Sequence, residues 1–90
     1  MKMNVIIRNV SEPRDWHSQA TGRSGVNRTI ILSPAEDEDS YICAAVSEEI
    51  WQPLGLQVGS TACLDLRFST KVYKSDYVAN QVRIVSPENA

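Results

Sequence analysis

The amino-acid sequence predicts an all-β domain, a five-stranded barrel with one short helix between its third and fourth strands. Two observations lead to this prediction. Five segments are rich in β-branched and apolar residues and are separated by turn residues, and a helix-like stretch from Ser47 to Leu54 follows the third of them. A five-strand chain with its helix in that position has the element order of the OB-fold, whose binding face is framed by the loop after strand 1 and the loop between strands 4 and 5.

Chain length and charge restrict the class of protein. Ninety residues suffice for one domain with a single small core, residues 1–90, and at that size an interface between copies would add useful burial, so we expect a homo-oligomer. The net charge of -2 argues against a protein that coats polyanions by bulk positive charge. The N-terminal apolar run is too short for a signal peptide or a membrane span, which predicts a cytoplasmic protein without a membrane partner.

The first two strands are expected on either side of a long loop. Met3 to Val10 is a β-branched run that stops before Pro13, because proline removes a donor from the strand ladder. Residues 14–27 show no hydrophobic period and contain two glycines, which predicts a flexible loop of the length that is usually functional or disordered. The second strand is then Arg28 to Leu32.

An acidic turn is expected before the third strand. Residues 35–40 hold the run Glu36-Asp37-Glu38-Asp39, which we interpret as a solvated tip that protects a sheet edge. The alternative is a metal site. Consecutive acids project in different directions and lack the alternating oxygen ligands and the glycine of a calcium loop, so we expect no metal.

The third strand, Tyr41 to Val46, leads into the helix expected from Ser47 to Leu54. The helix begins at a serine in the N-cap position, and the two acids that follow it lie where the helix dipole favours negative charge. Its apolar residues Ile50, Trp51 and Leu54 share one face. This spacing predicts that Trp51 closes one end of the barrel as a core residue, rather than stacking on a ligand.

The last two strands are expected on either side of a polar hairpin, residues 69–76. Thr61 to Phe68 alternates apolar and polar residues, so one face, which includes Leu64, Leu66 and Phe68, should face the core. Tyr77 to Val85 is the last strand, and residues 86–90 form a frayed end.

The two cysteines and the single histidine do not indicate an enzyme. Cys43 and Cys63 lie inside strand-like runs and are expected to be reduced, buried small residues, with a disulfide or redox pair as the lesser alternative. His17 lies in the predicted loop without a positioned partner. The stretch from Gly22 to Gly25 lacks the pattern of a phosphate-binding loop. We therefore expect neither catalysis nor a cofactor.

Basic residues interleaved with aromatics occupy both loops that frame an OB binding face. Single-stranded nucleic acid requires this combination, because cations contact the phosphates while flat rings stack on unpaired bases at ~1–3 kcal/mol per base. The residues predicted to bind single-stranded DNA or RNA are Arg14, Trp16, Arg23 and Arg28 around the first loop, Tyr41 at the start of the third strand, and Lys71, Tyr73, Lys74 and Tyr77 in the last hairpin.

A structural role for the same aromatics remains open. Tyr73 and Tyr77 could cover the hairpin as cross-strand partners, and Trp16 could pack on the barrel rim. The alternative function is a protein-interaction or assembly module without a nucleic-acid ligand, in which the acidic side from Glu36 to Glu49 meets a basic partner.

The C-terminal half of the chain also carries a family resemblance. Trp51 is followed by Leu56-Gln57-Val58-Gly59-Ser60, and the basic hairpin from Lys71 to Tyr77 leads into Gln81-Val82-Arg83-Ile84. In these residues the chain resembles a small, uncharacterised bacterial family of OB-fold proteins related to single-stranded-DNA-binding proteins. The resemblance implies an OB-fold, and it supports this architecture more than an activity. The chain departs from the family where Gln81-Val82 stands in place of an exposed tryptophan.

Overall fold

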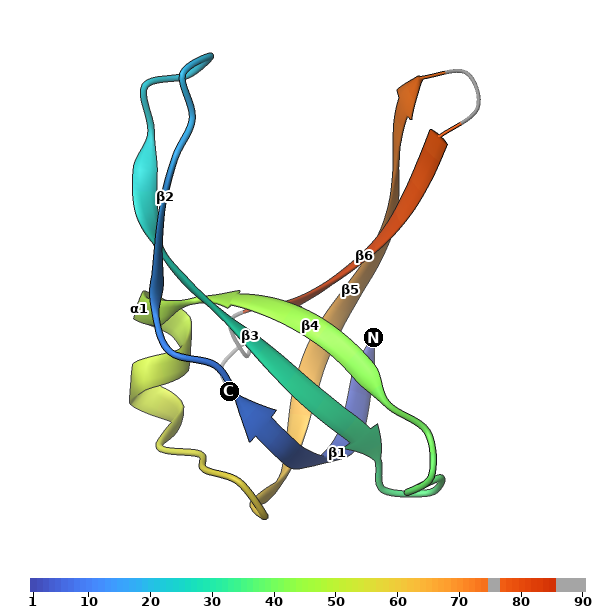
Figure 1. Cartoon of the computed structure of the whole chain (residues 1–90). Coiled ribbons are helices and arrows are strands. Elements are labelled where there is room, and N and C mark those ends of the chain that lie inside the picture. The colour runs from blue at the N-terminus through green and yellow to red at the C-terminus, as the bar shows by residue number, and fades with distance from the viewer. Residues whose placement is uncertain (75–76, 86–90) are drawn as a thin grey trace.

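The chain is mostly β structure with one short helical segment (Figure 1). The computed structural model describes residues 1–74 and 77–85, and it describes the side chains of these residues except 71–74, 77 and 78. The elements in chain order are β1 (Lys2–Val10), β2 (Arg14–His17), β3 (Ser24–Pro34), β4 (Ile42–Ser47), α1 (Glu48–Trp51), the 3-10 turn η1 (Gln52–Leu54), β5 (Thr61–Lys74) and β6 (Tyr77–Val85).

The six strands form one sheet that closes on itself. The strand order is β1-β5-β6-β4-β3-β2, and β1 pairs in addition with β3, so five strands form a ring to which β2 is attached. Strand β1 closes the ring because its first half pairs with β5 and its second half with β3. A register shift between Ile7 and Asn9 interrupts the pairing with β3, and such irregularities let a strand bend from one partner toward another.

The contact between β4 and β6 is the weakest pairing in the ring. These two strands run parallel, and among the described residues they share a single residue pair, Ala45 with Arg83. Before this pair β4 turns toward the acidic turn and β6 comes down from the last hairpin, so the two strands diverge (Figure 1). Their facing edges therefore border an opening on this side of the sheet.

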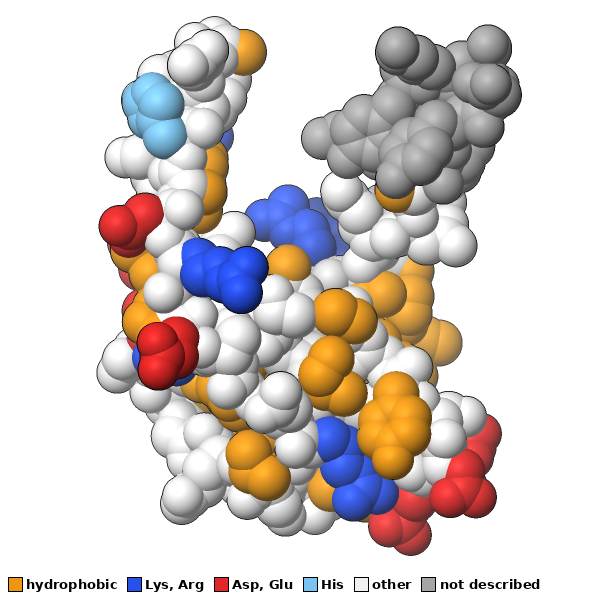
Figure 2. Space-filling model, viewed as in Figure 1, with side chains coloured by type: hydrophobic (Ala, Val, Ile, Leu, Met, Phe, Trp, Pro, Cys, Tyr) orange, Lys and Arg blue, Asp and Glu red, His pale blue; other side chains and the backbone are white. Residues whose placement is uncertain are grey.

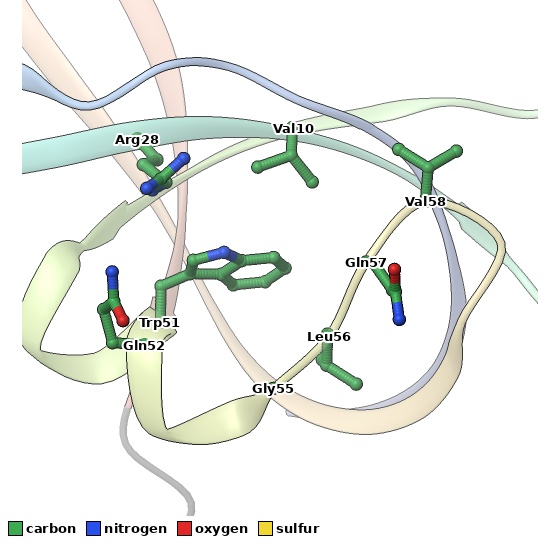
Figure 3. Close-up of a pocket in the computed structure, with 8 residues that line it drawn as sticks. All are labelled: Val10, Arg28, Trp51, Gln52, Gly55, Leu56, Gln57 and Val58. Carbon is green, nitrogen blue, oxygen red and sulfur yellow. The ribbon is translucent and has the colours of Figure 1, made fainter.

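The core lies inside the ring and contains the inward residues of each strand. Trp51 joins it with only 6% of its surface exposed, which confirms the prediction that it is buried. Its indole lies below Val10 and Arg28 and beside Leu56 (Figure 3), and a pocket of about 320 Å³ remains there. The core residues are Val5, Ile7, Ile30, Leu32, Ala44, Val46, Trp51, Leu64, Leu66 and Ile84.

The helical segment covers the predicted residues but differs in its details. It is one α-helical turn followed by the 3-10 turn, and it ends where Gly55 adopts a positive φ of 63°, which glycine adopts without steric cost. Ser47 occupies the N-cap position, but its side chain makes no capping hydrogen bond, contrary to the role expected for it. Glu48 in the first turn is instead held by Arg28, as described below.

Residues 14–27 do not form the flexible loop that the sequence predicts. Arg14–His17 form β2 and pair antiparallel with the first residues of β3, which begins at Ser24 rather than Arg28. In the last hairpin, β5 continues past the predicted end at Phe68 to Lys74 and pairs with β6 through most of the region expected as a polar hairpin. The two hairpins project from the ring as two arms on the same side of the molecule (Figure 1). We call them the β2–β3 arm and the β5–β6 arm.

Three residues expected in the core are exposed. Cys43 and Cys63 are both free and exposed, because Ala44 and Leu64 beside them take the inward positions and successive side chains of a strand point to opposite faces. Phe68 has the inward phase of Leu66 but is 50% exposed, because it lies at the base of the β5–β6 arm, beyond the core.

Among the described residues, no helix is long and apolar enough to cross a membrane.

Candidate functional site

A groove runs across β3, β4 and β6 between the two arms. Three pockets of about 800, 420 and 460 Å³ follow one another along it. The first two share Asn27 and Arg83, and the last two share Cys43 and the β6 residues from Asn80 to Val82. The space-filling view shows the face hollowed between the arms, with acidic side chains toward its margins (Figure 2). The shared lining residues make the three pockets one continuous groove.

The floor of the groove is made of small, uncharged side chains. Cys43 and Ala45 project outward from β4, because Ala44 between them turns into the core. Asn27 and Thr29 of β3 lie on the same outer face, separated by Arg28, whose guanidinium is held by Glu48. Thr29 and Ala45 are directly opposite in the antiparallel pairing, as are Asn27 and Ser47. Short side chains at these positions leave the groove open above the strands.

Trp16 forms one end of the groove. It is 40% exposed and stands opposite Gly25 in the β2–β3 pairing. A Cβ atom on Gly25 would lie 2.8 Å from Trp16 Nε1, so the absence of a side chain on Gly25 lets the indole lie close against the strand. Glu48 and Glu49 from α1 contribute to the same pocket. Glu48 is paired with Arg28, and Arg83 lines the same pocket, so the exposed indole lies beside side chains of both charges.

Tyr41 and Phe68 form the other end. Tyr41 is 67% exposed and Phe68 is 50% exposed, and both line the pocket where β4 and β6 diverge. None of the described residues that line this pocket is charged. Its polar groups include the hydroxyls of Tyr41, Ser69 and Thr70 and the amides of Asn80 and Gln81. The groove therefore ends in a pocket whose described lining is uncharged and includes two aromatic rings.

Arg83 lies between the two aromatic ends, where it lines both of the other pockets. It is opposite Arg67 in the β5–β6 pairing, so two like charges share one face of the sheet. Like charges directly opposite each other are unfavourable for folding. Among the side chains that the structure describes, neither arginine has an ion-pair partner. An anion bound beside them would relieve this repulsion.

Arg14 and Arg23 are exposed on the β2–β3 arm. Arg14 is opposite Asn27 in the pairing with β3, and directly opposed residues lie on the same face of an antiparallel pair. Arg14 and Trp16 are two residues apart in β2, and side chains alternate along a strand, so Arg14 lies on the face of the arm that carries Trp16. Arg23 lies in the turn of the arm, where its carbonyl oxygen accepts a hydrogen bond from the Ser18 amide at 2.8 Å.

The structure places Arg28 apart from the other predicted arginines. Its Nε and Nη2 atoms donate to the two carboxylate oxygens of Glu48 at 2.6 and 3.0 Å, and its Nη1 donates to the Ser11 carbonyl at 3.0 Å. The hydrogen bond to Glu48 raises the pKa of Arg28, and the same bond, with one from Gln52, lowers the pKa of Glu48. Both side chains of the pair are only 20% exposed. Arg28 is therefore engaged within the fold.

Four predicted residues lie in the β5–β6 arm, and their side chains are outside the described part of the structure. Lys71 and Lys74 belong to β5, and Tyr73 and Tyr77 lie in the same hairpin. The pairing of Lys74 with Tyr77 places the backbones of these two residues opposite each other near the tip. Their part in binding stays a prediction from the sequence.

Sequence reasoning missed Arg83 and Phe68 as residues of the groove. The sequence places Arg83 in the last strand without a binding role, and its position opposite Arg67 depends on the strand register. Phe68 ends an alternating run that reads as core throughout. One signal in the sequence could have indicated the pairing of Arg67 with Arg83. Both residues have the outward phase of two strands joined by one hairpin, and residues of two such strands lie opposite each other.

The acidic turn lies outside this groove. Residues 36–39 are exposed, and Glu38 contacts Arg8 at 3.6 Å. Arg8 also donates from Nε to the hydroxyl of the buried Ser33 at 3.1 Å, so this cation helps to hold the turn against the sheet. In the part of the chain that the structure describes, no group of three or more His, Cys, Asp or Glu side chains could hold a metal ion.

Comparison of the chain with protein-family models, with curated proteins and with solved structures finds no match. The geometry of the groove and the chemistry of its residues therefore carry the functional argument.

Proposed function

We propose that this chain is an OB-fold protein that binds single-stranded nucleic acid in the groove between its two arms. The strand pairings support the OB-fold. A bent first strand pairs with both halves of the sheet, a parallel contact closes the ring between β4 and β6, and the helical segment lies between the third and fourth strands of the ring. An OB-fold binds oligonucleotides over the face formed by its second and third strands, which correspond here to β3 and β4.

The continuity of the groove is the observation that carries the proposal. An exposed ring at one end, Trp16, and two at the other, Tyr41 and Phe68, are joined by a floor of small neutral residues with Arg83 in the middle. Unpaired bases stack on aromatic side chains whatever their sequence, while arginine contacts the backbone between them. This arrangement fits a strand whose bases reach both ends and whose phosphate contacts Arg83.

The same features favour a single strand over a duplex. The net charge of -2 gives little general attraction for a polyanion, so affinity must come from specific contacts. Rings at the ends of a groove can stack only on bases that are not already paired and stacked in a helix. We therefore expect preferential binding to single-stranded DNA or RNA, at modest affinity and with a weak dependence on salt.

A fluorescence titration with labelled oligonucleotides at low and moderate salt tests binding. Replacing Arg83 with Ala should weaken binding and reduce the salt slope by ~0.7, the value for one phosphate contact on a single strand. Lys2→Ala is the matched control, because Lys2 is an exposed cation that lines none of the pockets described. Absence of any binding by the wild-type protein at low salt would refute the proposal.

The two free cysteines report on where the ligand sits. Cys43 is exposed on the floor of the groove, whereas Cys63 is exposed on the outer face of β5 and lines none of the pockets. A saturating oligonucleotide should slow the alkylation of Cys43 by a maleimide and leave that of Cys63 unchanged, as measured by mass spectrometry of the labelled peptides. Equal effects on both thiols would place the ligand elsewhere or indicate a global change.

Self-association is a second proposal, supported by strand β2. In the described sheet β2 lies at one end of the strand order, and all four of its residues are exposed. An exposed strand edge is a ready site for pairing with another chain. Light scattering across micromolar to millimolar concentrations should show a mass above that of the monomer. A constant monomer mass would refute self-association. A protein-interaction module would then need a different partner, for which the acidic turn is the candidate surface.

A further inference from the structure

The pocket between β4 and β6 has the lining of a site for one nucleobase. It measures about 460 Å³, within the range of small-molecule sites, and the Tyr41 and Phe68 rings contribute exposed apolar surface to it. The described residues around it carry no charge, so none of them attracts the negatively charged sugar-phosphate backbone. A flat, uncharged ring with polar edges fits this lining better than a phosphate does.

A phosphate contact lies directly beside this pocket. The neighbouring pocket shares Cys43, Asn80, Gln81 and Val82 with it and adds Arg83. A nucleotide could therefore place its base between β4 and β6 and its phosphate at Arg83. The neutral aromatic pocket and the arginine are therefore adjacent, as the base and the phosphate of one nucleotide are.

One amide in the pocket is hydrogen-bonded to its neighbour on the adjacent strand. Thr70 and Asn80 are opposite residues of β5 and β6, and the Thr70 hydroxyl donates to Asn80 Oδ1 at 3.2 Å. This bond occupies one acceptor position of the amide and directs its NH₂ group away from Thr70. Asn80 therefore presents mainly hydrogen-bond donors to whatever enters the pocket.

We infer that the pocket between β4 and β6 binds one unpaired base and discriminates among bases through the Asn80 amide, oriented by Thr70. The inference rests on the proposed function and goes beyond it, because stacking and phosphate contacts alone give no sequence preference. Asparagine recognises adenine by accepting from N6 and donating to N7 together. With one lone pair of its oxygen engaged by Thr70, the amide has less capacity to accept from N6, whereas its NH₂ group can donate to the carbonyl oxygens of thymine or uracil.

The test compares the binding of labelled oligo(dT) and oligo(dA) of equal length by the wild-type protein and its variants. The quantity of interest is the ratio of the two dissociation constants, and its change between proteins. Oligo(dA) stacks on itself, but this property is the same for every protein variant and cancels in that change. Wild-type protein should prefer oligo(dT), and Asn80→Ala should reduce the preference about five-fold, the effect of losing roughly one hydrogen bond.

Two further variants separate recognition from stability. Thr70→Val keeps the β-branched shape and removes only the hydroxyl, so it should reduce the base preference while oligo(dT) binding is largely retained, as expected for a positioning residue. Asn4→Ala is the control, because Asn4 is exposed on β1 and lines none of the pockets described. It should leave the ratio unchanged. Thermal unfolding verifies that all three variants are folded.

The outcomes distinguish this inference from the proposed function. If wild-type protein binds neither oligonucleotide, both the proposed function and the base pocket are refuted. If it binds both and the ratio is the same in wild type, Asn80→Ala and Thr70→Val, the base pocket is refuted and nucleic-acid binding stands. An equal change in Asn4→Ala would also refute the pocket, because the preference would then not originate at Asn80.

Discussion

The two tryptophans lie on different elements and have opposite environments. Trp51 lies on the helical segment over the closed ring and is 6% exposed, whereas Trp16 lies on the β2–β3 arm and is 40% exposed. Residues from β1, β3 and the loop after η1 surround Trp51. Trp16 has mainly the backbone at Gly25 beneath it. A large aromatic side chain is therefore a core residue in one region and an available surface in the other.

The same contrast occurs within the single strand β5. Leu64, Leu66 and Phe68 share one alternation phase, but the first two are buried and the third is half exposed. The strand passes from the ring, where neighbouring strands and the opposite wall cover its inner face, into the arm, where they do not. Burial in this protein depends on the layers around a residue as well as on the residue type.

Truncating the buried tryptophan should have the largest effect. Trp51→Ala should reduce the free energy of unfolding by ~3–5 kcal/mol, because it removes a large aromatic from the core and leaves a cavity. Chemical denaturation measures this, with Trp16→Ala as the matched control, for which we expect a loss below about 1 kcal/mol. Similar losses in the two variants would remove the distinction between core and groove tryptophan.

Truncating the exposed tryptophan should affect binding rather than stability. Trp16→Ala should weaken oligonucleotide binding by ~1–3 kcal/mol, the contribution of one stacked base, with little change in the salt slope because stacking is not screened as ion pairs are. Titrations at two salt concentrations measure both quantities. Unchanged affinity would show that the ring at this end of the groove does not contact the ligand.

A smaller change tests how Trp16 is supported. Gly25→Ala places a Cβ atom 2.8 Å from Trp16 Nε1, so the indole must shift. We expect the indole N–H resonance of Trp16 to move in two-dimensional NMR spectra, while that of Trp51 remains in place as an internal control. Oligonucleotide affinity should fall by less than in Trp16→Ala. An unmoved Trp16 resonance would show that the indole is not held against Gly25 in solution.

The smallest expected effect concerns the ion pair at the boundary of the two regions. The Arg28 guanidinium lowers the pKa of Glu48 in the folded protein, so this carboxylate contributes stability above its unfolded pKa of about 4.3 and loses that contribution as pH falls through the lower folded value. Glu48→Gln should therefore be less stable than wild type at neutral pH, and the difference should shrink below about pH 4. Thermal unfolding across this range measures it, and a difference independent of pH would contradict the assignment.

The sequence alone located most of the elements around the core. Hydrophobic alternation, β-branched runs and the glycine and proline stops are local signals, so they placed parts of β1, β3, β4, β5 and β6 and the helical segment over Ser47 to Leu54. The helical spacing around Trp51 likewise predicted its burial correctly. These features succeed because they depend on residues close together in the chain.

The tertiary structure decided the arms, the groove and the partner of Arg28. Arg14–His17 have no alternating pattern, and they form a strand only because Ser24 to Asn27 lie alongside to pair with them. Arg28 meets a carboxylate 20 residues away, and Arg83 meets Arg67 through the register of the β5–β6 hairpin. The cysteines are exposed because the ring fixes which alternation phase faces inward. Each of these outcomes depends on pairing between distant segments, which no local pattern in the chain specifies.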